Sequence, residues 1–197
     1  MSECAPNLVN SPALIQPGSM GQPLPGVEAR IDAAPGRTGE LLLRSPGMFL
    51  RYWRDPEETR RAFEDGFLRT GDLARVDADG FFWFAGRCKE IIVHGGANVS
   101  PQEVEEALCQ HPAVALAGVF GASDPVWGET VQAAVVLKAG SFPTGEDLCD
   151  FLSGRLAEWK MPASITVVPD LPIGPTGKIQ RRLLRERMTA AAAALTR

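Results

Sequence analysis

The stretch Gly86–Glu103 most constrains the fold of this chain, because the sequence before it and the sequence after it follow different periodicities. Within the stretch, Ile91–Val93 is a short apolar run next to the pair Gly95-Gly96, which predicts a brief strand opening into a tight turn. Ser100–Glu103 then supplies an N-cap residue, a proline at the first helical position and a carboxylate three residues after the cap. This pattern predicts a capping box and a helix that begins there.

Composition limits the classes of protein that fit. The 197 residues are 45% hydrophobic and 22% charged, which is ordinary for one globular domain or two small ones. A net charge of -4 gives no basic surface for nucleic acid. The four widely spaced cysteines, Cys4, Cys88, Cys109 and Cys149, predict reduced thiols. Because no segment reaches the roughly 20 apolar residues of a transmembrane helix and the first residues are polar, we expect a cytoplasmic protein without a membrane span.

The residues before Gly86 indicate a mostly β structure. Residues 1–26 are rich in Pro, Gly, Ser and Asn and predict a loop. The next segments predict antiparallel strands at Val27–Ile31 and Glu40–Arg44, a helix capped at Asp55, strands at Phe67–Arg69 and Leu73–Val76, and a hairpin turn at Asp79-Gly80 that leads into Phe81–Phe84.

The residues after Gly86–Glu103 alternate between helix and strand patterns. They predict a helix after Ser100, strands at Val114–Phe120 and Val131–Leu137 around a turn at Gly121–Pro125, a helix capped at Thr144, a strand at Ile165–Val168 and a basic helix from about Gln180. We expect the alanine-rich end after Met188 to be a frayed helix end. About 100 residues can hold a small core of their own, so this part is predicted to be an α+β domain.

Two motifs in the first part have both a structural and a functional interpretation. In Thr70-Gly71-Asp72, the aspartate can present two acceptor oxygens to the vicinal hydroxyls of a ribose, or the segment can be a simple Asx-type turn. In Gly86-Arg87-Cys88-Lys89, the guanidinium can contact a nucleotide, or the charges can form an ordinary solvated surface. Neither motif is specific alone.

Two motifs in the second part leave similar alternatives. His94-Gly95-Gly96 permits the close approach of an extended ligand, or is a plain tight turn. His94 has no partner at metal-ligand spacing and is interpreted as structural. Gly174–Ile179 puts Lys178 on a glycine-flanked loop, where it can reach a phosphate or be a surface lysine. The P-loop pattern fails because Ile179 follows the lysine.

Taken together and in this order, these motifs resemble the adenylate-forming superfamily, which contains acyl-CoA synthetases, luciferases and the adenylation domains of peptide synthetases. The matching segments cover nearly the whole chain and are Met1–Glu3, Gly18–Gly26, Gly39–Arg44, Gly47–Trp53, Thr70–Leu73, Gly86–Lys89, Gly95–Asn98, Pro101–Glu105, Trp127–Glu129 and Pro175–Ile179. The resemblance implies an incomplete, distorted barrel-like β subdomain over residues 1–87, a mobile α+β C-terminal lid domain over residues 88–188 and a tail over residues 189–197.

The resemblance also implies what the chain lacks. Family members are longer and carry a phosphate loop and most of the carboxylate pocket in a large N-terminal domain. We therefore expect the C-terminal fragment of an AMP-forming acyl-CoA synthetase that is inactive alone, with the missing N-terminal domain as its partner. The substrates of the intact enzyme are then a fatty or other carboxylic acid, ATP and CoA, with Mg²⁺ as cofactor. The identity of the acid and the oligomeric state stay open.

Four residues of the first part acquire nucleotide roles from the resemblance. Glu3 matches the acid that binds Mg²⁺, and Ser2 takes the place of a hydroxyl that meets the AMP phosphate. Asp72 and Arg87 match the residues that hold the ribose of ATP and AMP.

The resemblance assigns the remaining roles to the second part and to the hinge. Lys178 matches the catalytic lysine that bridges the carboxylate and the α-phosphate during adenylation. Lys89 falls at the hinge. Rotation of the lid about Lys89 would withdraw Lys178 and bring in Gly95 and Gly96, whose small size leaves room for the pantetheine arm of CoA.

Two departures from the family pattern and two alternatives remain. Ala97 stands where many relatives have Glu, and Ile173-Gly174 replaces a basic-Thr pair before the lysine loop. The first alternative is an amino-acid adenylation domain that serves a carrier protein. The second is a non-catalytic module that docks onto a separate N-terminal half or only binds a nucleotide.

Overall fold

A computed structural model of the chain describes residues 3–4, 7–175 and 177–195. The chain forms two compact units, Met1–Lys89 and Glu90–Arg197. It passes from the first unit to the second within a short 3-10 turn, η1 (Cys88–Glu90). The boundary therefore falls directly after Lys89.

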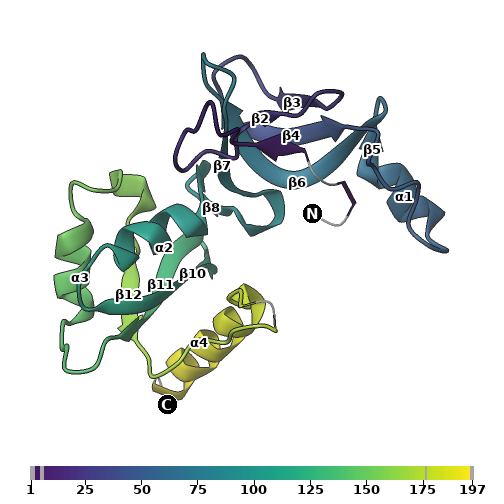
Figure 1. Ribbon diagram of the computed structural model, residues 1–197. Helices are drawn as coiled ribbons and strands as arrows, with labels where there is room; N and C mark the ends of the chain where they lie inside the picture. Colours follow the sequence, from purple (N-terminus) through teal and green to yellow (C-terminus); the bar gives the residue numbers. More distant parts are fainter. Residues whose placement is uncertain (1–2, 5–6, 176, 196–197) are drawn as a thin grey trace. The chain divides into compact units, whose positions relative to one another are not determined.

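The first unit is built on one antiparallel sheet that curls along β6 (Figure 1). Its strands are β3 (Glu28–Asp32), β4 (Gly39–Arg44), β5 (Phe63–Glu64), β6 (Phe67–Val76) and β7 (Phe82–Arg87). They lie in the order β3-β4-β6-β5, and β7 also pairs with β6. The predicted mostly β character and the antiparallel pairing of the first two strands are confirmed.

The buried apolar side chains of the first unit form two clusters. Leu41 and Leu43 of β4 pack with Ala74 and Phe82 in one cluster, as expected for residues two apart on a strand. Leu68 of β6, which pairs with Leu43, packs in a second cluster that includes Ala62 of the helix α1. The helix α1 (Pro56–Ala62) begins where the sequence predicts, because the Asp55 carboxylate accepts a hydrogen bond from the Glu58 N–H at 2.9 Å.

Two expectations for the first unit are wrong in detail. Residues 1–26 are not only loop, because β1 (Leu8–Val9) pairs with β2 (Gln22–Pro23). The two predicted strands Phe67–Arg69 and Leu73–Val76 form the single strand β6. The chain continues through Gly71, whose φ of 70° suits glycine and whose N–H donates to Glu40 Oε1 at 2.9 Å.

The second unit contains a mixed sheet with three helices. Its strands are β8 (Ile92–His94), β9 (Ala97–Val99), β10 (Val114–Asp124), β11 (Gly128–Leu137) and β12 (Ser164–Val167), and its helices are α2 (Pro101–Cys109), α3 (Gly145–Leu152) and α4 (Arg181–Leu195), with a 3-10 turn η2 (Glu158–Lys160). Strands β10 and β11 form a long antiparallel hairpin, and β12 runs parallel to β11. The predicted alternation of helix and strand is confirmed.

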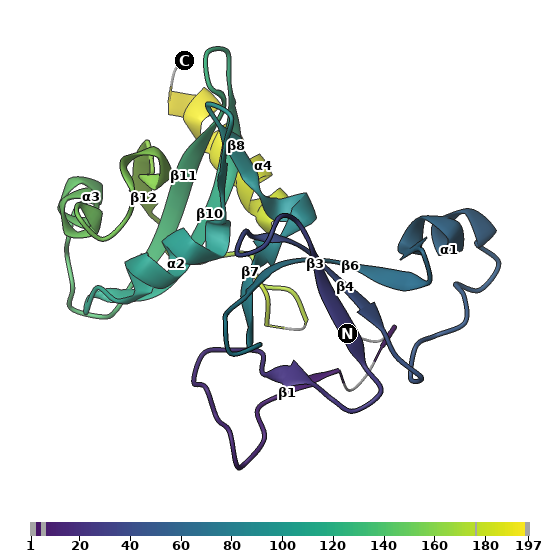
Figure 2. The ribbon, with the colours of Figure 1, turned by 90° about the horizontal axis from the view of Figure 1, so that it is seen from above.

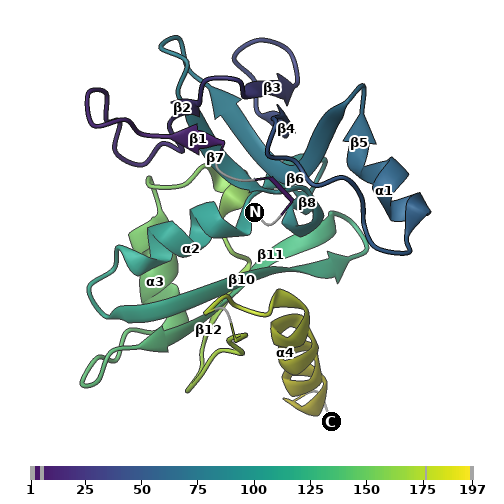
Figure 3. The ribbon, with the colours of Figure 1, turned by 45° about the vertical axis from the view of Figure 1, so that its right-hand side comes forward.

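The two faces of this sheet carry different helices (Figures 2 and 3). Val119, Ala133 and Val135 belong to the core cluster that contains residues of α2 and α3. Their neighbours Phe120 and Ala134 point the other way and pack with Leu171 and with Leu184 of α4 in a separate cluster. Because side chains alternate between the two faces along β10 and β11, α2 and α3 pack on one face and α4 packs on the other.

Two sequence predictions for the second unit need correction. The predicted turn at Gly121 comes later, because β10 runs on to Asp124, whose carboxylate accepts from the Trp127 N–H at 2.9 Å. The helix α2 begins after Ser100 as predicted, but the Ser100 side chain makes no capping hydrogen bond. The Glu103 carboxylate instead accepts from Lys160 Nζ at 2.6 Å, so the predicted capping box does not form.

Further expectations concern termini, thiols and membranes. The helix α4 extends past Met188 to Leu195. All four cysteines are free thiols. Among the described residues, no helix has both the length and the apolar character that a membrane span requires.

Candidate functional site

Asp72 and Arg87, the two residues expected at the ribose, lie at directly paired positions of β6 and β7. Arg87 Nε is 2.8 Å from Asp72 Oδ1. The Asp72 side chain is 19% exposed and the Arg87 side chain is 48% exposed, so the pair is open to solvent on the arginine side. The pair presents a carboxylate and further guanidinium N–H donors, which are groups that can bind hydroxyls and a phosphate.

The segment before Asp72 is held by hydrogen bonds to β4 and to itself. Thr70 Oγ1 donates to the Leu41 carbonyl at 2.7 Å and accepts from the Asp72 N–H at 3.1 Å. The Gly71 N–H donates to the Glu40 carboxylate at 2.9 Å. These bonds fix the backbone at Asp72, so its carboxylate is oriented before any ligand binds.

Glu3, the expected Mg²⁺ ligand, lies beside an aromatic hydroxyl. Tyr52 Oη donates to Glu3 Oε1 at 3.4 Å, and burial together with the Glu3 carboxylate raises the pKa of Tyr52. No group of three or more metal-ligating side chains occurs in the described part of the chain. One carboxylate still fits Mg²⁺, which is commonly held by one or two carboxylates with waters and substrate phosphates. Ser2 lies outside the described residues.

Gly95 and Gly96 form the two-residue turn between β8 and β9, where His94 pairs with Ala97. Their φ angles of 56° and 82° match a type I′ hairpin turn. The Gly95 N–H donates to the Trp127 carbonyl at 2.9 Å. Both glycines are exposed, so the turn presents bare backbone on the surface of the second unit.

Trp127 lies over Gly95, and no role was predicted for it from the sequence. A Cβ added at Gly95 would lie 2.9 Å from Trp127 Cε3. The His94 and Trp127 rings stack with centroids 5.2 Å apart, and His94 Nδ1 lies 2.8 Å from the Glu129 carbonyl. The only sequence signal for Trp127 was its position in Trp127–Glu129, one of the segments that resemble the family. These contacts make His94 a support of the turn, in agreement with the structural interpretation of this residue.

We expect Gly95→Ala to be more destabilising than Gly96→Ala. Both substitutions force alanine into a left-handed backbone, but only a Cβ at Gly95 would meet the Trp127 ring, while a Cβ at Gly96 would meet no atom within 4 Å. The unfolding free energy should fall by about 2 kcal/mol for Gly95→Ala and by about 1 kcal/mol for Gly96→Ala. Denaturant unfolding checks this difference, and equal losses would contradict it.

Lys178 lies on a short hairpin-like loop between β12 and α4. Ile173 bridges to Ile179, and the Gly174 N–H donates to the Lys178 carbonyl at 2.8 Å. Ile179 packs with the core cluster beneath α4, so the preceding Lys178 points away from it. The side chain is exposed and forms no ion pair with any residue that the structure describes. Among the described residues, Lys178 is thus an exposed cation without an ion-pair partner, next to the bridge between Ile173 and Ile179.

Arg181, three residues after Lys178, ties the start of α4 to the rest of the second unit. It forms ion pairs with Glu90 and with Glu105, the second at 2.7 Å. Glu105 also accepts from the Val119 N–H at 2.9 Å, and burial raises the pKa of its carboxyl. The sequence predicted only a basic helix face here, because nothing in the spacing relates these three residues.

Comparison with known proteins identifies the relatives of this chain. Residues 103–178 match the family of AMP-binding enzyme C-terminal domains. The chain is 43% identical over 181 residues to a long-chain-fatty-acid–CoA ligase of Bacillus subtilis, covering 88% of this chain and 32% of that protein. It is 39% identical over 190 residues to the fatty acid–[acyl-carrier-protein] ligase ScoC of Streptomyces coeruleorubidus, covering 93% of this chain and 37% of that protein.

Solved structures agree with this relationship. An ATP-bound chimera of RpMatB and BxBclM superposes with a TM-score of 0.86 at 36% identity, covering 95% of this chain and 39% of the chimera. The o-succinylbenzoate CoA synthetase of Bacillus subtilis, in complex with its acyl-adenylate intermediate, gives a TM-score of 0.80 at 36% identity, covering 85% of this chain and 35% of that one.

The chain thus combines a curled β unit with a second unit that matches the AMP-binding enzyme C-terminal domains. The chain belongs to the adenylate-forming superfamily, and its homologues are acyl-CoA ligases and synthetases. It spans about a third of the length of the curated relatives it matches. It is similar to the C-terminal portion of these acyl-CoA ligases.

Proposed function

We propose that this chain closes the active site of an AMP-forming acyl-CoA synthetase whose substrates are a fatty or other carboxylic acid, ATP and CoA. In the first step a carboxylate oxygen attacks the α-phosphorus of ATP and pyrophosphate leaves. In the second step the CoA sulfur attacks the acyl carbon, AMP leaves and the thiol proton passes to solvent. The observation that carries the proposal is the cross-strand pair of Asp72 and Arg87, at 2.8 Å, in a chain whose homologues are CoA ligases.

The residues of the first unit would hold the nucleotide. Asp72 would accept hydrogen bonds from the ribose hydroxyls, and Arg87 would stay beside it as donor and counter-charge. Glu3 would hold Mg²⁺, which when bound supplies charge neutralisation at the phosphates. Because the Tyr52 hydroxyl donates to Glu3, the carboxylate is kept in one orientation.

The residues of the second unit would serve the two steps in turn. Lys178 would stabilise the negative charge shared by the carboxylate and the α-phosphate during adenylation. Rotation about Lys89 would then exchange Lys178 for the Gly95-Gly96 turn, beside which pantetheine would pass. The unit boundary directly after Lys89 and the bare backbone of the turn support this proposal.

Pyrophosphate exchange tests the proposal on the 197-residue chain itself. We expect no exchange above background with ATP and fatty acids, because the sequence contains no glycine-rich phosphate loop. The same assay on a protein that joins this chain to the large domain of a relative should show exchange. Clear turnover by the chain alone would refute its role as one part of the enzyme.

A carrier protein is a second candidate for the thiol acceptor. The 39% identity to a ligase named for an acyl-carrier-protein favours this alternative. Supplying CoA and a phosphopantetheine-bearing carrier protein in parallel distinguishes the two acceptors. A non-catalytic docking role would instead give co-purification with a larger polypeptide and no thioester. We also propose a cytoplasmic location, which the four free cysteines support.

A further inference from the structure

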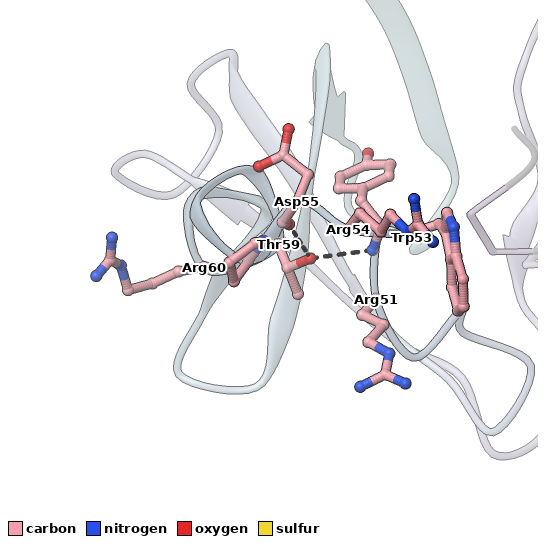
Figure 4. A pocket seen from close by; sticks show the side chains of 8 residues that line it. Arg51, Trp53, Arg54, Asp55, Thr59 and Arg60 are labelled. Carbon is pink, nitrogen blue, oxygen red and sulfur yellow. Dashed lines mark hydrogen bonds between the residues drawn. The ribbon is translucent and has the colours of Figure 1, made fainter.

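An open pocket of about 550 Å³ lies in the first unit, where the chain enters α1 (Figure 4). Its lining includes Arg51, Tyr52, Trp53, Arg54, Asp55 and Thr59. Its Tyr52 also donates to Glu3, but none of the residues assigned above to the ribose, the lysine loop or the glycine turn belongs to it. A pocket of this volume is within the range of small-molecule sites, about 300 to 1,000 Å³.

The lining of this pocket contains three arginines and one aspartate. Neither Arg51 nor Arg54 forms an ion pair with any residue in the described part of the chain. Arg60 at the edge is paired with Glu57. The Asp55 carboxylate already accepts from the Glu58 N–H, as the cap of α1. The two unpaired guanidinium groups outnumber the single Asp55 carboxylate, so the lining keeps a net positive charge that favours an anion.

The same pocket exposes an aromatic ring. The Trp53 residue is 77% exposed, although indole is a large and mostly apolar side chain. The Arg54 guanidinium lies 5.7 Å from the Trp53 ring centroid, so cation and ring are neighbours. A planar ring bound to the indole face would cover apolar surface and bring its own charge to the arginine.

The backbone that presents these side chains is fixed and strained. The Tyr52 N–H donates to Thr59 Oγ1 at 3.0 Å, and the Thr59 hydroxyl donates to the Asp55 carbonyl at 2.7 Å, as the dashed lines in Figure 4 mark. Between these anchors Arg54 has a φ of 56°, which is unfavourable for a residue with a Cβ. Strain of this kind is concentrated at ligand sites and switches.

We propose that this pocket binds a small aromatic anion. The planar ring would stack on Trp53, and a phosphate or carboxylate group would receive hydrogen bonds from Arg51 and Arg54. Arginine suits both anions because its planar fork of N–H donors matches two oxygens at once. One molecule that carries both a ring and an anion would use both contacts, because Arg51, Trp53 and Arg54 line the same pocket.

Nuclear magnetic resonance of the indole N–H of Trp53 tests the proposal on the full chain. The signal is assigned as the one missing in Trp53→Phe. Phenyl phosphate and benzoate are titrated to distinguish a phosphate from a carboxylate. Inorganic phosphate, which lacks the ring, and benzyl alcohol, which lacks the charge, serve as half-ligands for comparison. We expect at least one aryl anion to shift the signal saturably, and both half-ligands to bind at least about tenfold more weakly.

Three variants determine whether the arginines carry this binding. Arg51→Ala and Arg54→Gly should each weaken the aryl anion about tenfold, which is the effect of one charge-assisted hydrogen bond. Arg54→Gly also removes the backbone strain, so loss of binding there cannot result from unfolding. The control is Arg37→Ala, an exposed arginine of the same unit, which should bind like the unsubstituted chain. No saturable shift, or unchanged affinity in both pocket variants, would overturn the proposal.

Discussion

Lys178→Ala will lower acyl-adenylate formation by roughly 100-fold to 1,000-fold, in a protein that joins this chain to the large domain of its relatives. Thioester formation from supplied acyl-AMP will change little. The reason is that Lys178 is an exposed cation without an acidic partner among the described residues, on a loop fixed by the bridge between Ile173 and Ile179. Pyrophosphate exchange measures the first step, and thioester release from acyl-AMP measures the second.

Two further variants isolate the role of the Lys178 charge. Lys138→Ala removes an exposed lysine of the same unit and should leave both steps unchanged. Lys178→Arg keeps the charge but replaces a compact ammonium with a planar guanidinium, so it should restore only part of the first step. If Lys178→Ala reduced both steps equally, the proposed exchange of Lys178 for the glycine turn would be contradicted.

Local signals account for the parts of the fold that the sequence predicted well. The helices α1 and α3 begin at Asp55 and Thr144 because each cap side chain accepts from a backbone N–H three residues ahead. The Ser100 pattern was equally good locally but failed as a cap, because Lys160, far away in sequence, binds the Glu103 carboxylate. A tertiary ion pair therefore overrode a local signal.

The pairing of Asp72 with Arg87 depends on a bulge that the sequence does not reveal. Ala74 pairs with Phe84, yet Leu73 pairs with Gly86, so Ala85 is an extra residue on β7. Without this bulge Asp72 would lie opposite Gly86, and the Arg87 side chain would point to the other face. The motifs supplied the two residues, but only the register brings them together.

The contacts of Trp127 and Arg181 were beyond prediction for a different reason. Trp127 reaches Gly95 across the sheet, and Arg181 reaches Glu90 and Glu105 from another helix. Each contact joins residues that are far apart in sequence, where no periodicity relates one to the other. Such contacts follow from packing, which depends on the whole unit.

Arg181→Met will lower the unfolding free energy of the second unit by about 3 kcal/mol, because it leaves the buried Glu105 carboxylate without its partner. The Glu105 side chain is 13% exposed and that of Arg181 is 22% exposed, so water can solvate the unpaired carboxylate only to a small extent. The matched control is Arg182→Met, the next residue, whose side chain is 87% exposed and paired only with Glu186. Its effect should stay within about 0.5 kcal/mol. Hydrogen exchange of the β10 and β11 amides measures both variants, and similar losses would contradict a buried role for Arg181.

Burial of the Glu105 carboxyl gives the second unit a pH dependence with a defined sign. Burial raises the pKa of Glu105 above its ordinary value of 4.5, so the folded state binds this proton more tightly than the unfolded state does. The stability that this group contributes is full below pH 4.5 and is lost as the pH rises through the folded pKa. Glu105→Gln cannot titrate, so its stability should vary less with pH above 4.5 than that of the unsubstituted chain. An unchanged pH profile would mean that Arg181 holds the carboxylate ionised throughout, and that the ion pair outweighs burial.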